Sequence, residues 1–278
     1  MNNQNLYKSL NAQLSQRENE LLKKIANVDK YSQAEINSLV GVYKSEITAL
    51  IEKSCNLALL NAKDSKIVQY TKYLNQCKQI AKKYEIAPKV FELKNIVPIF
   101  GGGMDKTLLE KVWNKAYPDN LNVDDRIDKL GKSIKDKVEL YLKQGISNGT
   151  SSRDIAKEIA DNLNIERNSA IRLAVSTTNT MYNTAQAEIS IQAIFVIGIK
   201  ITRDADGSEK CDVCAEHGGE VGGDGIEYYK TDFGGDDYDL YVIANAPTYH
   251  NNCKCSVEDI IESAEQFVQR ARNEYKNK

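Results

Sequence analysis

The sequence contains little of several residue types that mark special classes of protein. It has 4 prolines, 1 tryptophan and 2 histidines among 278 residues, and its formal net charge is only -2. Because a general basic excess is missing, a dedicated nucleic-acid wrapper is excluded and any DNA contact must be local. The most apolar stretches, Ile191–Ile201 and Ile96–Phe100, are far shorter than the roughly 20 residues of a membrane-spanning helix. We therefore expect a soluble protein.

A secretory signal is also missing, because residues 1–16 have no basic start followed by an apolar run. We expect the chain to stay in the cytoplasm, where its 6 cysteines are kept reduced. Reduced cysteines either bind metal or are simply buried. Cys55 and Cys77 lie in helical stretches, and we predict that both are small buried apolar side chains.

Charge is divided unevenly along the chain. Residues 1–90 contain 14 Lys and Arg against 8 Asp and Glu, whereas residues 201–259 contain 4 against 14. Two interpretations of the basic N-terminal region remain open. It is either a surface for phosphate or an acidic protein, or a solvated helix face.

Most of the chain has helical periodicity. Over residues 6–81 the apolar residues recur at helical spacing, with a break expected at residues 27–32. Ser151 and Asp154 have the spacing of a capping box, which predicts a helix start. Further helices are expected over residues 108–116, 126–144, 151–163, 169–190 and 257–275. The polar run at residues 176–180 is unfavourable inside a helix, so its side chains either have a function or bond to carbonyls one turn earlier.

The composition changes after residue 190. β-Branched and aromatic residues over 194–202 predict a strand, and the Gly- and Asp-rich segment 207–239 predicts turns and short hairpins. The predicted fold class is α+β: a mostly helical N-terminal body with a small C-terminal β-rich module stapled by a Cys/His metal site. The predicted domains are a basic helical region at 1–83, a helical core at 84–190, the β-rich module at 191–260 and a C-terminal helix or tail at 261–278.

Both histidines and four of the cysteines fall within residues 211–255. They form two groups, Cys211, Cys214 and His217 followed by His250, Cys253 and Cys255. Two thiolates two residues apart on a tight turn can face one ion, and a pair from a distant turn completes the tetrahedron that zinc prefers. The sequence therefore predicts structural zinc. Its candidate ligands are Cys211, Cys214, His250, Cys253 and Cys255, with His217 as the expected spare.

Other chemistries of the same residues remain open: reduced cysteines without metal, or a redox or catalytic thiol. A thioredoxin-like pair needs a βαβ setting, which the Gly- and Asp-rich surroundings do not supply. A Cys–His catalytic pair leaves most of the clustered residues unexplained. Because a four-ligand structural site keeps no open position for water, we expect no enzymatic activity.

The order of these features resembles the C-terminal motif of the phage Mu F-like head morphogenesis family of minor capsid proteins. The family ending is typically His-Pro-Asn-Cys-Arg-Cys, and here Asn251 and Lys254 replace the proline and the arginine. Further similar positions are Asp204, Gly218, Gly219 and Pro247, and upstream Trp113, residues 125–127, Gly145, Gly149, residues 170–172, Thr177 and Asn183. The family's usual Thr-Glu pair reads Thr177-Thr178 here, so a role that rests on that carboxylate does not transfer.

The resemblance covers about residues 84–260 and implies a minor capsid protein of a tailed bacteriophage. It implies a low-copy protein inside the head near the portal, which supports head assembly and DNA packaging or ejection. The implied partners are the portal and the capsid or scaffold proteins, with viral DNA contacted through the basic N-terminal helices and no membrane in the assembled virion. The implied location is the capsid interior, and the host cytoplasm during assembly. The residues leave two alternatives, a zinc-dependent DNA-binding protein and a cysteine-based enzyme.

Overall fold

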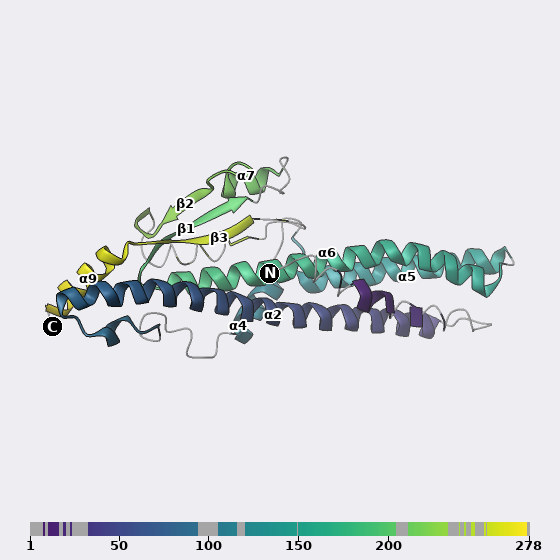
Figure 1. Cartoon of the computed structure of the whole chain (residues 1–278). Coiled ribbons are helices and arrows are strands. Elements are labelled where there is room, and N and C mark those ends of the chain that lie inside the picture. The colour runs from purple at the N-terminus through teal and green to yellow at the C-terminus, as the bar shows by residue number, and fades with distance from the viewer. Residues whose placement is uncertain are drawn as a thin grey trace. The chain divides into compact units, whose positions relative to one another are not determined.

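The computed structural model describes residues 8, 11–16, 19–20, 23, 33–93, 105–115, 120–148, 150–203, 211–232, 239, 242, 246–247, 253 and 255–276. These residues are mostly helical, with a small three-stranded antiparallel sheet toward the C-terminus (Figure 1). None of the described helices is both long enough and apolar enough to cross a lipid bilayer. The predicted combination of a helical body and a small β-rich part is confirmed.

Among the described residues, four helices with given bounds precede the sheet. They are α2 (Gln33–Ala81), α4 (Asp105–Asn114), α5 (Val123–Ser147) and α6 (Ser152–Gln192). Short 3-10 turns over Lys82–Tyr84 and Pro88–Phe91 follow α2. The break expected at residues 27–32 lies outside the described residues. Helices α4 and α5 confirm the predictions for residues 108–116 and 126–144, apart from small shifts at their ends.

Helix α6 differs from the prediction of two helices, because it runs without interruption through Ser152–Gln192. Its start confirms Ser151 as the capping residue. The backbone N–H of Asp154 donates to Ser151 Oγ at 3.2 Å, and Ser151 Oγ donates to Asp154 Oδ2 at 2.6 Å. Residues 164–168, which separate the two predicted helices, are part of α6, and one of them, Glu166, accepts a hydrogen bond from Ser133 on α5 at 2.8 Å.

Hydroxyl groups of the polar run inside α6 form hydrogen bonds within the helix. Thr177 Oγ1 donates to the carbonyl of Leu173 at 2.9 Å, and Thr178 Oγ1 donates to that of Ala174 at 2.7 Å. Both threonines are fully buried. For these two residues, the interpretation that the hydroxyls bond back one turn is confirmed.

The chain forms two compact units, each built from segments that are distant in the sequence. The first contains residues 1–55, 113–178 and 250–252. Its described part is helical and buries apolar stripes of α2, α5 and α6: Tyr43, Ile47, Ile51, Cys55, Ile127, Ile134, Val138, Ile155, Ile159 and Ile171. The second contains residues 56–112, 179–249 and 253–278 and carries the sheet.

The sheet of the second unit has the order β2-β1-β3, with both neighbours antiparallel to β1. Its strands are β1 (Val196–Arg203), β2 (Ile226–Tyr229) and β3 (Cys255–Ile261), and α7 (Asp212–Gly218) lies between β1 and β2 in the chain. The predicted strand at 194–202 is confirmed. The helix predicted over 257–275 is wrong in its first part, because β3 occupies that part and pairs with β1. The helix there, α9, spans Ala264–Lys276.

An aromatic cluster forms one core of the second unit. The Phe195 ring lies 4.8 Å from that of Tyr70 and 5.8 Å from that of Phe267, between ring centroids, in edge-on arrangements. Cys77 is buried in the same cluster, and Cys55 is buried in the first unit. The prediction that these two cysteines are small buried side chains is confirmed.

Candidate metal centre

The first cysteine pair lies at the start of α7. Cys211 is the N-cap residue, and its Sγ accepts a hydrogen bond from the backbone N–H of Cys214 at 3.4 Å. A side-chain acceptor at this position satisfies one of the N–H groups that a helix leaves open in its first turn. The capped turn therefore holds both sulfur-bearing residues on a tight bend.

Three thiols meet in the second unit. Cys214, Cys253 and Cys255 are buried, and their sulfur atoms all lie within 4.8 Å of one another. The Sγ atoms of Cys214 and Cys253 are 3.7 Å apart. Two thiolates bound to one tetrahedral zinc, with Zn–S distances of about 2.3 Å, have sulfur atoms about 3.8 Å apart. The spacing of this thiol group therefore fits zinc.

The surroundings of the thiol group keep water away and fix the backbone. Apolar residues pack around it, namely Ala187, Ile199, Ile201, Val242, Ala246 and Val257. On α6, the side-chain amide of Asn183 donates a hydrogen bond to the backbone carbonyl of Cys255 at 3.2 Å. Outer contacts of this kind orient metal ligands and tune their affinity.

Electrostatics keep the Cys214 and Cys255 thiols protonated when no cation is present. Burial, together with the neighbouring thiol of Cys253, raises the pKa of Cys214 to about 12. Hydrogen bonding with Cys253 and burial also raise the pKa of Cys255. A protonated thiol is a poor nucleophile, whereas a bound cation stabilises thiolates and reverses the shift.

The structure brings together three of the five predicted ligands. Cys211 lies beside the group and is half-buried, while His250 lies outside the described residues. His217 is not in the thiol group found among the described residues, and its backbone carbonyl accepts a hydrogen bond from the Tyr228 hydroxyl at 3.2 Å. The identity of the fourth ligand, Cys211 or His250, stays a prediction.

Sequence reasoning missed two features near the sheet. The resemblance marks Asn183 without giving it a role, and the structure supplies that role through the carbonyl of Cys255. A buried contact between Lys66 and Asp259 is also missing from the sequence analysis. In the sequence, this contact is indicated only by the position of Lys66 itself. This lysine lies at helical spacing among apolar residues of α2, four residues after Ala62 and four before Tyr70.

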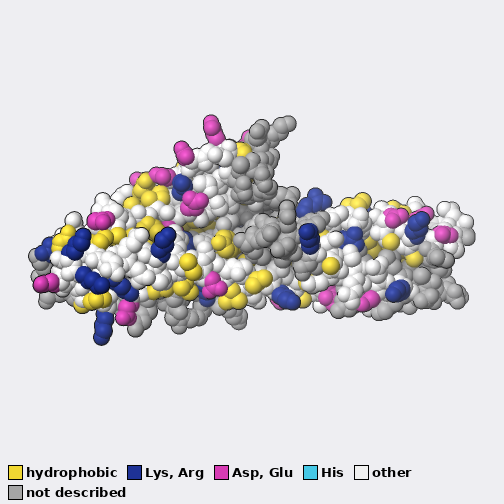
Figure 2. Space-filling view, viewed as in Figure 1, with side chains coloured by type: hydrophobic (Ala, Val, Ile, Leu, Met, Phe, Trp, Pro, Cys, Tyr) yellow, Lys and Arg dark blue, Asp and Glu magenta, His cyan; other side chains and the backbone are white. Residues whose placement is uncertain are grey.

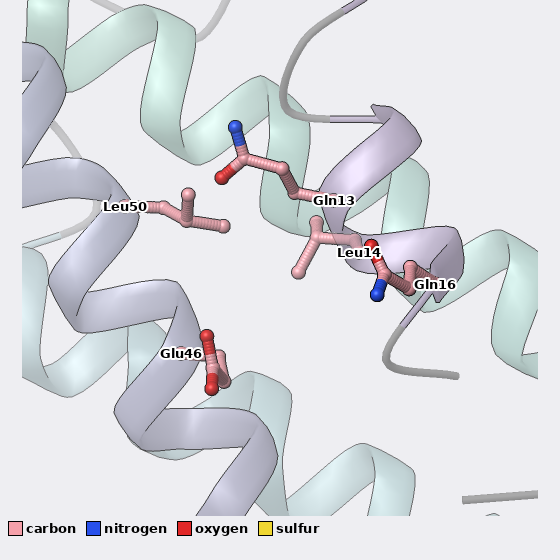
Figure 3. A pocket seen from close by; sticks show the side chains of 5 residues that line it. All are labelled: Gln13, Leu14, Gln16, Glu46 and Leu50. Atoms are coloured by element: carbon pink, nitrogen blue, oxygen red, sulfur yellow. The ribbon is translucent and has the colours of Figure 1, made fainter. Parts of the chain in front are cut away.

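The first unit also contains a small hollow. It has a volume of about 140 Å³ and is lined by Gln13, Leu14, Gln16, Glu46 and Leu50. Figure 3 shows Leu14 and Leu50 facing each other across it, with one carboxylate at its edge. Amide groups and a single carboxylate do not make a nucleophile or an acid–base pair.

Comparison with protein families identifies part of the chain. Residues 136–258 match the family model described as Phage Mu protein F like protein. No match was found among curated proteins or among solved structures. The matched segment contains α6, β1, α7, β2 and all four clustered cysteines. The expected resemblance is confirmed over residues 136–258, which are similar to the phage Mu F-like family.

Proposed function

We propose that this chain is a minor capsid protein that acts in the head morphogenesis of a tailed bacteriophage. The observation that carries this proposal is the match of residues 136–258 to the phage Mu F-like family. We place the protein in the head interior near the portal, in few copies, where it supports head assembly and the passage of DNA. Its proposed partners are the portal and the capsid or scaffold proteins.

We propose a structural zinc ion for the thiol group. Cys214, Cys253 and Cys255 would hold it, with Cys211 or His250 as the fourth ligand. The ion supplies a cross-link between the first turn of α7 and the start of β3, which are far apart in the sequence. The 3.7 Å separation of the Cys214 and Cys253 sulfur atoms supports this assignment.

The burial of the thiols supports a structural role over a catalytic one. Cys214, Cys253 and Cys255 are only 4%, 3% and 6% exposed. A nucleophilic thiol must be reachable by its substrate, and reactive cysteines are at least partly exposed. The proposed protein therefore acts through contacts and not through turnover.

The charge distribution supports protein contacts at the sheet and DNA contacts elsewhere. Acidic side chains gather over α7 and β2 (Figure 2). The exposed ones are Asp212, Glu216, Glu220, Asp224, Glu227 and Asp232. An acidic face repels phosphate and attracts basic protein surfaces. This charge disfavours a DNA-binding zinc module, and we assign any contact with viral DNA to the basic residues within 1–90.

The test uses particles of the phage that encodes the chain, made with and without its gene. We expect the chain in purified heads at a copy number well below that of the major capsid protein. We also expect particles made without the gene to assemble or deliver DNA poorly, and the full-length chain to restore them. A chain absent from purified heads, or a gene deletion without effect on infectious particles, would contradict the proposal.

A further inference from the structure

The second unit contains a buried lysine–aspartate pair. The Lys66 Nζ is 2.5 Å from Asp259 Oδ1, and the two side chains are 2% and 0% exposed. Lys66 comes from the buried face of α2, and Asp259 comes from β3. Removing two ions from water costs several kcal/mol each, so a buried pair gains from any reaction that removes both charges.

Two hydroxyl groups complete the site. Tyr70 donates a hydrogen bond to Asp259 Oδ2 at 2.8 Å. Ser190 Oγ lies 2.5 Å from Asp259 Oδ1 and 3.0 Å from Lys66 Nζ. Each carboxyl oxygen therefore has a neutral hydroxyl against it, and the amine is held against the carboxyl group.

We propose that Lys66 and Asp259 condense to form an intramolecular isopeptide bond that joins α2 to β3. The Lys66 ammonium first passes one proton to the Asp259 carboxylate that it contacts. The lone pair of the resulting amine then attacks the carboxyl carbon, and a C–N bond forms. The bond from that carbon to one carboxyl oxygen breaks. The oxygen leaves as water, carrying its own proton and one from the amine, so no oxidant, reductant or cofactor is required.

The surroundings favour a neutral amine and a stabilised transition state. Burial lowers the pKa of Lys66, although Asp259 opposes the shift, and this favours the neutral amine. Burial raises the pKa of Tyr70, so its hydroxyl stays a proton donor toward the carboxyl group. Donors placed on a carboxyl oxygen stabilise the negative charge that develops during attack. Because the fold already holds the amine next to the carboxyl group, the two groups do not have to meet by diffusion. Such fixed proximity corresponds to effective molarities of about 10⁵ M or more.

Two other lysine–carboxylate pairs among the described residues lack this environment. Lys111 contacts Glu188 and Lys137 contacts Glu166, but these lysine side chains are 48% and 33% exposed. Contact with water removes the desolvation cost that drives the proposed reaction in the buried pair. They serve as internal controls within the same protein.

The test is the mass of the purified full-length chain under denaturing conditions. We expect a mass lower by one water, and after proteolysis a branched peptide joining the segments that carry Lys66 and Asp259. Lys66→Arg and Asp259→Ala should restore the full mass, whereas Lys111→Arg should keep the loss of water. Ser190→Ala should slow the reaction, because it removes one hydroxyl neighbour of the carboxyl group.

Two outcomes would overturn the proposal. One is a wild-type chain of full mass with both residues in linear peptides. The other is a loss of water that persists in Lys66→Arg, which would place the dehydration elsewhere. If the Lys66 and Asp259 variants do not fold, the branched or linear state of the wild-type peptides decides the question.

Discussion

The side-chain amide of Asn183 holds the backbone carbonyl of Cys255 at 3.2 Å. Asn183 comes from the interior of α6, and Cys255 is the first residue of β3. Because the peptide carbonyl is fixed, the direction of the Cys255 side chain toward Cys214 and Cys253 is fixed as well. A helix thus positions a thiol that it does not itself carry.

Replacing this asparagine should weaken metal binding without removing a ligand. For Asn183→Ala we expect about a 10- to 100-fold loss of zinc affinity, and a loss of about 1–3 kcal/mol in the free energy of unfolding from the unsatisfied carbonyl. Competition with a chelating dye measures the first, and urea denaturation the second. The control is Asn162→Ala, a half-buried residue of α6 whose side-chain amide donates to the carbonyl of Glu158. Unchanged zinc affinity in Asn183→Ala would refute the positioning role.

Removing a thiol should remove the metal. We expect about one zinc per wild-type chain by elemental analysis, and less than half of that in Cys253→Ala, since structural sites need four ligands. A chelator should lower the melting temperature of the wild type and leave that of Cys253→Ala unchanged. Cys77→Ala is the matched control, because this buried cysteine lies in the aromatic core. Zinc-free wild-type protein with a full melting temperature would reject the metal centre.

The helical elements could be predicted from the sequence because their apolar residues repeat at helical spacing. The two errors have a common physical cause. Residues 257–261 suit either a helix or a strand, and pairing with β1 decides the outcome. Residues 164–168 separate the two helices predicted from the sequence, but α6 continues through them and Glu166 bonds to Ser133 on α5. In both cases contacts with residues that are distant in the sequence determine the secondary structure, against the local propensity.

The candidate site could be predicted in part for a similar reason. The spacing of Cys211 and Cys214 reports on one local turn, so the sequence reveals it. The contact between Lys66 and Asp259 joins residues that are far apart in the sequence, and no local pattern encodes such a contact. Only a charged residue in an apolar stripe hints that a partner exists.

Stability at alkaline pH should depend on Cys55. Burial raises the pKa of this thiol from 9.0 to about 12, and Glu52 acts in the same direction. Because the folded pKa is the higher one, the thiol's contribution is complete below about pH 9 and is lost as the pH rises toward 12. Cys55→Ala should therefore show a smaller decline in the free energy of unfolding between pH 8 and 10.5. Asn56→Ala, at an exposed neighbour, should keep the wild-type slope, and identical slopes for both variants would contradict the prediction.

The aromatic core should be sensitive to the loss of one ring. Phe195→Ala should lower the free energy of unfolding by about 3–5 kcal/mol, because a fully buried ring leaves a cavity. Denaturant titration measures this loss. Ile194→Ala is the neighbouring control, with a side chain that is 53% exposed, and it should change stability by less than about 0.5 kcal/mol. Equal effects of the two changes would show that Phe195 does not support the core.

The strand order β2-β1-β3 also governs what happens while the chain is being made. The ribosome completes the central strand before either neighbour, and β3 emerges last of the three. Until residue 261 has been synthesised, one side of β1 offers unpaired N–H and C=O groups to any passing strand. Pairing across such a long separation is slow. A nascent or prematurely terminated chain is therefore the form most prone to aggregate, and we expect it to depend most on chaperones.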